Sequence, residues 1–417
     1  MNTATPPSKE PGPESQLRAA LLVMLAGVCA ALHVGKLAPA ITVLVDALGL
    51  SLLQAGFLLS LVQLAGMSLG LAFGSVADAL GPRRSMLMGL TVLAAASVAG
   101  AASNHVLLMM ALRALEGLGF LLVVLPAPGF VRRLAPPGRA HAMLGLWGGY
   151  MPAATAMALL LGPLCIGALG WRAWWALLGL LTAAMALWLM RAVPEPPRLP
   201  VPATAVSTAR WTSRLRRTVG AAGPWLVALC FAVYSGQWLA VVGFLPTIYT
   251  QAGVPPGAIA ALTALAAAVN IIGNASSGQL LQRGLPPQRL LLTGFAVMGL
   301  AAVATFASAA GSGLPASLRY LAVLLFSGFG GLIPGTLFAL AVRVAPGEDT
   351  LGTTVGWMQQ WSAAGQFLGP PLVAALAARA GGWHWTWLAT GSCALLGLGL
   401  SGLLARRLQT PVARSEE

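Results

Sequence analysis

The feature that most constrains this chain is a succession of twelve long apolar stretches separated by short polar gaps. A helix needs about 20 mostly apolar residues to cross a bilayer, and each stretch reaches that length. The sequence therefore predicts an all-α membrane protein with twelve transmembrane helices. They run over about 19–42, 53–77, 84–103, 105–131, 141–167, 172–192, 223–250, 257–281, 289–309, 316–343, 352–378 and 383–405.

Composition excludes most other classes of protein. Hydrophobic residues make up 58% of the 417 residues and charged residues 8%, against about 45–50% and about 25% in soluble domains. An ordinary soluble enzyme and a disordered chain are both excluded. All four cysteines lie inside apolar stretches, so they read as packed hydrophobic side chains, and neither a disulfide framework nor a metal site is expected.

The net charge of +14 follows from topology rather than from a nucleic-acid partner. Of the 24 Lys and Arg residues, 19 fall in gaps on one side if the N-terminus is cytoplasmic, and only three fall on the other side. By the positive-inside rule, both termini are expected in the cytoplasm. Arg outnumbers Lys by 22 to 2, which is typical of a GC-rich bacterium, so we expect a multi-pass protein of the cytoplasmic (inner) membrane.

The polar segments divide the chain into five parts. We expect a disordered cytoplasmic N-terminus at 1–17, a six-helix bundle at 18–192, a Pro- and Arg-rich cytoplasmic linker at 193–222, a second six-helix bundle at 223–408 and a cytoplasmic tail at 409–417. The first apolar stretch is too long for the apolar region of a signal peptide, so we expect it to be retained as the first span.

The two bundles share an internal repeat. Arg133 and Arg343 lie 210 residues apart in similar contexts, and Trp147 and Trp357 have the same spacing. Six helices per repeat give both copies the same topology, so we expect pseudo-symmetric halves related by an axis along the membrane normal. A substrate site is then expected at their interface near mid-membrane.

A motif between the second and third predicted helices identifies a family. The stretch Gly74-Ser-Val-Ala-Asp78-Ala-Leu-Gly81-Pro-Arg83-Arg84 resembles the GxxxDxxGxRR signature that the major facilitator superfamily of transporters carries at this place. In that family the element acts as a cytoplasmic gate. The resemblance implies gating roles for Gly74, Asp78, Gly81, Arg83 and Arg84, together with Arg133 at the same membrane level. A static topology anchor is the alternative.

Further elements agree with this resemblance. Arg113-Ala-Leu-Glu116-Gly117 resembles the RxxxG element of the family's fourth helix, and Gly162-Pro163 resembles part of its antiporter motif without the closing glycine pair. Gly35-Lys36-Leu-Ala-Pro39, with Gly145-Leu-Trp147, looks most like the cyanate/nitroimidazole transporter branch, in which a cation sits late in the first helix.

Three charges are embedded in the predicted spans, namely Lys36, Arg113 and Glu116. Because a charge at mid-bilayer costs about 2.5–3.5 kcal/mol on insertion scales, each should pair with another or face a wet cavity. Arg113 and Glu116 lie three residues apart and can pair on one helix. Lys36 has no acid within helical reach, so we expect an unpaired cation that binds an anionic substrate, with Arg113 as a second contact. His33 shares its helical face and is either a substrate or proton ligand or a packed side chain.

Polar and aromatic residues inside other spans are further candidates, because polar groups in lipid need partners. They line a cavity or join helices to one another. The expected substrate-binding residues are Lys36, Arg113, His33, Tyr150, Gln237, Trp238, Asn270 and Gln360.

These features favour a secondary transporter that works by alternating access. Uptake or exchange of a small anion is the leading hypothesis. The alternative is proton-coupled efflux of drugs or apolar metabolites, with Glu116 as the proton-coupling acid. An enzyme is not expected, since the histidines show no catalytic or metal spacing and no GxxxxGK[ST] phosphate loop occurs. We expect a monomer without cofactors that binds a small-molecule substrate and membrane lipids, with protons as candidate coupling ions.

Overall fold

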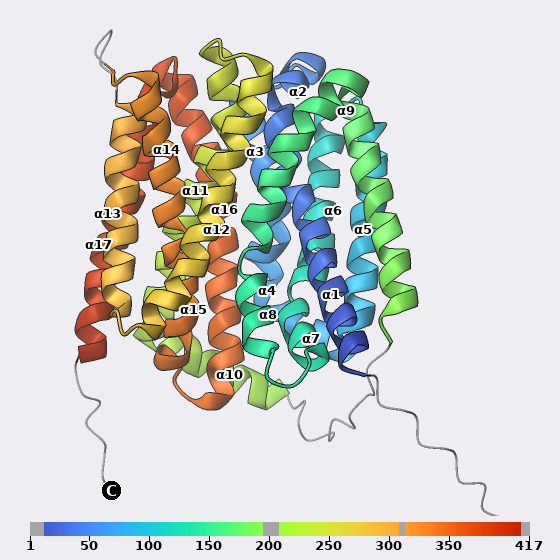
Figure 1. The fold of residues 1–417 in the computed structure, drawn as a ribbon, viewed down its shortest axis with the longest axis vertical. Helices are drawn as coiled ribbons and strands as arrows, with labels where there is room; N and C mark the ends of the chain where they lie inside the picture. The colour runs from blue at the N-terminus through green and yellow to red at the C-terminus, as the bar shows by residue number, and fades with distance from the viewer. Residues whose placement is uncertain (1–11, 195–207, 308–312, 410–417) are drawn as a thin grey trace, which may run out of the picture.

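A computed structural model describes residues 12–194, 208–307 and 313–409 and consists of helices joined by short turns (Figure 1). The prediction of an all-α membrane protein is confirmed. In the N-terminal half, the elements are α1 Pro13–Gly35, η1 Ala38–Ala40, α2 Ile41–Leu48, α3 Leu52–Ser60, η2 Leu61–Gln63, α4 Leu64–Leu80, α5 Pro82–Ala101, α6 Val106–Val124, α7 Ala127–Leu134, α8 Ala140–Trp147 and α9 Tyr150–Ala192.

The C-terminal half follows the linker and repeats this plan. The linker contains α10 Thr208–Gly220, and the elements of the C-terminal half are α11 Ala222–Gln251, α12 Pro256–Gln282, α13 Pro287–Phe306, α14 Ala316–Gly330, α15 Leu332–Val344, η3 Glu348–Thr350, α16 Leu351–Ala380, η4 Trp383–Trp385 and α17 Thr386–Gln409. Both ends of the described chain lie at the end of the molecule that carries α10 (Figure 1).

Ten segments in the described residues are long and apolar enough to cross a membrane, and two features account for the difference from the twelve expected. The 43-residue α9 contains Gly170 with φ 84°, where the helix breaks and the chain turns back, so α9 holds two of the expected spans. Helix α16 carries three glutamines, so it is too polar to count as an apolar span. It tolerates them because it packs against α3, α4 and α11 instead of facing lipid on all sides.

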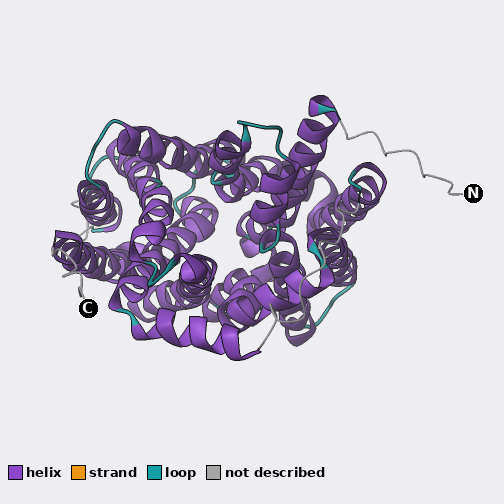
Figure 2. Cartoon of the chain, turned by 90° about the horizontal axis from the view of Figure 1, so that it is seen from below, coloured by secondary structure: helices purple, strands orange, loops and turns teal. Residues whose placement is uncertain are grey.

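The two halves lie side by side, and their helices are seen end-on from the α10 end of the molecule (Figure 2). Contacts between the halves are made mainly by α16 with α3 and α4, and by α12 with α9. Within each half, an early helix packs closely on a late one, as α1 does on α9 and α11 on α16. These equivalent pairs are what the internal repeat predicts.

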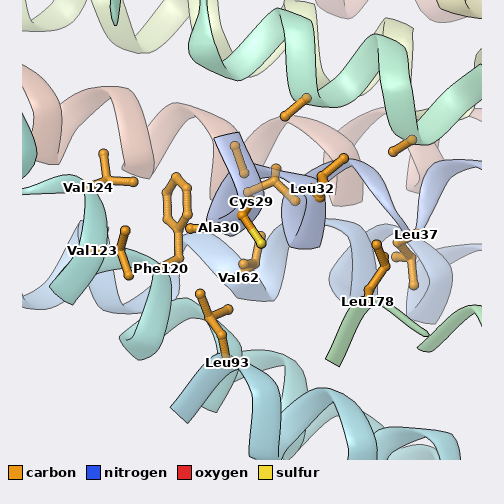
Figure 3. Close-up of a cluster of buried hydrophobic side chains, with 14 of the residues drawn as sticks. Cys29, Ala30, Leu32, Leu37, Val62, Leu93, Phe120, Val123, Val124 and Leu178 are labelled. Atoms are coloured by element: carbon orange, nitrogen blue, oxygen red, sulfur yellow. The ribbon is translucent and has the colours of Figure 1, made fainter. Parts of the chain in front are cut away.

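Close packing rather than the hydrophobic effect holds helices together in lipid, so small residues matter at crossings. The interior of the N-terminal half brings together Cys29, Val62, Leu93, Phe120 and Leu178 from five different elements (Figure 3). Nearby, α5 and α6 approach so closely at Gly89 and Gly119 that a Cβ on either would lie 2.6–2.7 Å from the other's carbonyl oxygen.

Two local expectations differ from the structure. Residues 13–17, expected to be disordered, form the first turn of α1, which begins with Pro13 at a position that proline favours and carries Glu14 in its first turn. Residues 1–11 and 410–417 lie outside the described residues. The linker contains the helix α10, because Trp211, Leu215 and Val219 recur at helical spacing and are partly buried, while Arg216 and Arg217 are exposed.

Helix α10 is tied to the C-terminal half. The guanidinium of Arg217 donates a hydrogen bond to the Asp349 carboxylate in η3, and α10 also contacts α11 and α16. The part of the linker that forms α10 therefore packs on the C-terminal half.

We expect Gly119→Ala to lower stability by about 1–3 kcal/mol, the usual cost of overpacking a close contact, because its methyl group would meet the α5 backbone. Thermal unfolding of the purified protein in detergent measures this loss. Gly167→Ala in α9 is the matched control, since a Cβ there meets open space, and it should leave the midpoint unchanged or raise it. Equal midpoints for the two variants would contradict the close packing.

Acid should release α10. The hydrogen bond from Arg217 lowers the pKa of Asp349 from its ordinary value of 3.8. A lowered carboxylate pKa contributes stability above the unfolded-state value, and this contribution is lost as the pH falls through the folded-state value. We therefore expect residues 208–220 to be less protected from amide exchange below pH 3.8, relative to the intrinsic exchange rate at the same pH. At neutral pH, Asp349→Asn should do the same, whereas the neighbouring Glu348→Gln should not.

Candidate functional site

The first membrane span, Glu14–Leu48, is broken past its midpoint, and Lys36 lies at the break. Helix α1 ends at Gly35 with Lys36 as its C-cap, and the chain resumes as the short 3₁₀ turn η1 before α2. Pro39 within η1 has no N–H to donate, so one helical hydrogen bond is lost there and an irregular turn is favoured. The break leaves carbonyl groups without intrahelical partners inside the membrane.

A buried charge cluster fills the space beside this break. We define it as His33, Lys36, Arg113 and Glu116, all of which are at most 1% exposed. Glu116 Oε1 lies 2.5 Å from Lys36 Nζ, and Glu116 Oε2 lies 2.6 Å from Arg113 Nη1. Of the two roles left open for Arg113 and Glu116, the structure shows the local pair that their spacing allows. The expectation of an unpaired Lys36 is wrong, because packing of α6 against α1 supplies an acid that spacing along α1 alone does not reveal.

The other groups around Lys36 complete its coordination. Its ammonium donates to Ser97 Oγ at 2.9 Å, lies 3.3 Å from His33 Nδ1, and sits 4.8 Å from the centre of the Trp175 ring. The other ring nitrogen of His33, Nε2, lies 2.8 Å from Thr182 Oγ1. His33 is thus held between two partners as a packed, hydrogen-bonded side chain.

Arg113 also stabilises irregular backbone in two other helices. Its Nη1 donates to the His33 carbonyl at 2.6 Å, in the last turn of α1. Its Nε donates to the Leu58 carbonyl at 3.1 Å, where α3 gives way to the 3₁₀ turn η2. Trp174 adds a third such bond, from Nε1 to the Lys36 carbonyl at 3.1 Å. Buried carbonyls need partners, and these donors supply them.

The charge cluster lies inside the N-terminal half. The partners of Lys36, Arg113 and Glu116 described above come from α1, α3, α5, α6 and α9, all within residues 13–192. One cation is neutralised by Glu116 and one positive charge remains. The Nη2 of Arg113 is buried without a hydrogen-bond partner.

Uncharged groups make the side-chain contacts between the halves that the described residues show. Gln63 Nε2 donates to Gln366 Oε1 at 3.0 Å, and the Leu71 N–H donates to Gln360 Oε1 at 3.2 Å. The rings of Phe57 and Phe367 lie 6.3 Å apart across the same boundary. Amides and aromatic rings are therefore what the halves present to each other at these points.

Gln237 adds a further amide to this boundary. It lies three and seven residues before Ala240 and Phe244 on α11, hence on one helical face, and both of those residues pack into the apolar core of the N-terminal half. Gln237 is 2% exposed, and neither its Oε1 nor its Nε2 has a hydrogen-bond partner. An unpartnered amide costs about 1–3 kcal/mol, so Gln237 is the strongest candidate for a group that a ligand satisfies. We call Gln63, Gln237, Gln360 and Gln366 the interface amides.

Other predicted binding residues have partners within their own half. Asn270 Nδ2 donates to the Ser327 carbonyl at 2.7 Å and to Tyr234 Oη at 3.1 Å, and Trp238 Nε1 donates to Ser327 Oγ at 3.0 Å. Tyr150 stacks on Trp147 with ring centres 4.4 Å apart. The structure brings Gln237 and Gln360 to the boundary between the halves, and places Trp238 and Asn270 in an internal network.

The structure describes the predicted gating motif only in part. Gly81 has φ 83°, which favours glycine, and it caps the N-terminus of α5. Arg83 donates to the Val193 and Met190 carbonyls at 2.7 and 2.5 Å, which anchors α5 to the C-terminal end of α9. Gly74 and Asp78 lie on α4 with side chains outside the described residues, Arg84 follows Arg83 on α5, and Arg133 is exposed in the last turn of α7.

The site also uses side chains that sequence reasoning missed, among them Gln63, Ser97, Trp174, Trp175, Thr182 and Gln366. A signal existed for the two glutamines, since an amide inside an apolar span needs a partner. Serine and threonine give no such signal, because their hydroxyls can bond their own helix. Among the described residues, no group of three or more His, Cys, Asp and Glu side chains is placed to hold a metal ion.

Two halves built from long helices, in contact mainly through α16 with α3 and α4 and through α12 with α9, define a multi-pass membrane protein of the transporter class. Residues 23–370 match the model of the Major Facilitator Superfamily, and the chain belongs to that family. Its members are transporters that bind small molecules, not enzymes.

Solved structures agree on the fold. A bacterial homolog of the human lysosomal transporter Spinster, in an inward-facing and occupied conformation, superposes with a TM-score of 0.78 at 15% identity. Its unoccupied form gives 0.75, also at 15% identity, and both alignments cover 95% of this chain and 98% of the other.

One curated relative shows a local similarity. The tetracenomycin C resistance and export protein of Streptomyces glaucescens is 33% identical over 100 residues. That match spans 24% of this chain and 19% of the relative.

Removing the central acid of the charge cluster should be more damaging than removing a cation. Glu116→Gln leaves Lys36 and Arg113 buried without a counter-charge, which typically costs about 3–5 kcal/mol. Lys36→Met removes one cation, keeps the Arg113–Glu116 pair and retains apolar volume, so it should cost less. Thermal unfolding in detergent compares the two variants. A larger loss for Lys36→Met would contradict this assignment of the central role to Glu116.

Proposed function

We propose that the chain exports uncharged or weakly polar organic molecules, such as drugs or apolar metabolites, by alternating access. This was the alternative to anion transport on sequence grounds. The export activity named for the Streptomyces glaucescens relative is compatible with it.

The observation that carries the proposal is that the embedded charged side chains lie inside the N-terminal half, whereas the described contacts between the halves are uncharged. The embedded charges are turned into the interior of the N-terminal half and bonded there, whereas the described contacts between the halves are made by amides, aromatic rings and apolar groups. A substrate that binds between the halves meets a neutral surface. Such a surface favours a neutral or apolar solute over a hydrated anion, whose desolvation is costly.

The substrate in this proposal contacts Gln237 and the other interface amides. Rocking of residues 18–192 against 223–408 exposes them to one side of the membrane at a time. Glu116 is the candidate proton-coupling acid. The motif from Gly74 to Arg84, with Arg133, is the candidate gate, and both termini face the cytoplasm of a bacterium.

Transport of a small anion is the second candidate. One observation favours it, because the charge cluster keeps one net positive charge and Arg113 Nη2 has no partner. In this case Lys36 and Arg113 would bind the anion with His33, and the likeness of Gly35–Pro39 to the cyanate/nitroimidazole branch would extend to its substrate.

A transport assay in everted membrane vesicles separates the two candidates. With tetracenomycin C as the export probe, we expect accumulation that collapses when a protonophore dissipates the proton gradient. Radiolabelled cyanate, the anion probe, should not accumulate above empty vesicles. Cyanate accumulation that Lys36→Ala abolishes would instead support the anion candidate and contradict the export proposal.

Gln237→Leu tests the proposed binding position. Losing a hydrogen bond of about 1–1.5 kcal/mol should weaken the apparent affinity for the probe about fivefold to tenfold, with protein abundance unchanged. Gln279→Leu, on the exposed surface of α12, is the matched control and should transport normally. Equal transport by both variants would remove Gln237 from the binding site.

A further inference from the structure

A hollow outside the boundary between the halves carries chemistry that transport does not use. It has a volume of about 370 Å³ and lies where α12, α15 and α17 end and α13 begins, at the same end of the molecule as α10 (Figure 1). Apolar side chains in its walls include Leu281, Leu285, Pro286 and Leu408, and polar atoms line the hollow to a similar extent. Arg343 and Gln288 contribute the polar part of the lining.

The surroundings of this hollow are strongly basic. Arg283 and Arg289 flank the turn between α12 and α13, Arg343 ends α15, and Arg406 and Arg407 end α17. No Asp or Glu occurs in the sequence between Glu195 and Glu348. The acid that follows Glu348, Asp349, is already paired with Arg217. Arg283, Arg289, Arg343 and Arg407 therefore give this end of the C-terminal half an excess of positive charge, which favours an anionic partner.

The surface beside the hollow is apolar and exposed. Phe338 and Val342 lie four residues apart on α15, on one helical face, and are 37% and 65% exposed, while Leu403 on α17 is 52% exposed. Because these side chains belong to membrane-spanning segments, their exposed faces meet lipid. The arginines around the hollow and the exposed apolar side chains beside it together match an amphiphile, which has a charged head group and an apolar tail, better than a soluble anion.

We propose that this hollow binds an anionic phospholipid, with the phosphodiester at Arg343 and Gln288 and the acyl chains along Phe338, Val342 and Leu403. The site is separate from the interface amides and does not depend on which solute is transported. A bound lipid bridges the ends of α12, α13, α15 and α17, and so stiffens this end of the C-terminal half.

Native mass spectrometry of protein released from nanodiscs tests the site. In phosphatidylcholine doped with phosphatidylglycerol, we expect a retained phosphatidylglycerol molecule on the unaltered protein. Since each basic residue near a membrane surface contributes about 1 kcal/mol to binding an anionic lipid, Arg343→Gln should weaken retention about fivefold. Arg379→Gln, an exposed arginine at the other end of the molecule in the last turn of α16, removes the same charge and should retain the lipid.

Two further experiments distinguish lipid binding in the hollow from nonspecific attraction by positive charge and from binding of a soluble anion. Ala339→Trp fills the hollow without changing charge, and should lose the lipid while the thermal midpoint in detergent stays unchanged. Equal retention by Arg343→Gln and Arg379→Gln, or full retention by Ala339→Trp, would overturn the proposal. Displacement of the lipid by inorganic phosphate at equal concentration would also overturn it, since the occupant would then be a free anion.

Discussion

The structure of the N-terminal half depends on one carboxylate. Glu116 lies between Lys36 and Arg113 in a membrane-embedded interior, where an unpaired charge is costly and a hydrogen-bonded pair is tolerated. Neutralising Lys36 permits a cation at the broken end of α1. Orienting Arg113 places its other N–H groups on the carbonyls that α1 and α3 leave free where each helix changes geometry. The break in the first span and the irregular second span are therefore held by a single cluster.

That arrangement also shapes what the halves present to each other. Lys36 and Arg113 both bind Glu116 inside the N-terminal half. The described contacts across the boundary are therefore made by amides, aromatic rings and apolar groups. Helix α16 is polar for the same reason, since one face meets the other half instead of lipid. Neutral hydrogen-bonding groups can exchange partners at low cost when two halves move, whereas a buried ion pair across the boundary would resist separation.

Particular residues show which features of the structure could be predicted from the sequence and which could not. The spans were located to within a few residues because a bilayer dictates length and apolarity, and a local pair of Arg113 and Glu116 was one of the roles left open because three residues is a helical distance. Lys36 was misjudged because its partner lies 80 positions away on a helix whose rotation periodicity alone does not fix. Gln63 and Gln366, 303 positions apart, were missed as a pair for the same reason, while α10 was missed because a short amphipathic helix resembles a basic linker.

By itself the sequence determined the fold class, the order of the spans, the two-fold repeat and the family, since these follow from lipid thickness, charge asymmetry and constant offsets along the chain. Only the tertiary structure decided that Lys36 and Arg113 both face Glu116, that Gln237 stands without a partner at the boundary, and that a basic hollow forms where four helix ends meet. Each of these depends on how helices rotate and cross, and close packing of side chains from distant segments sets that rotation.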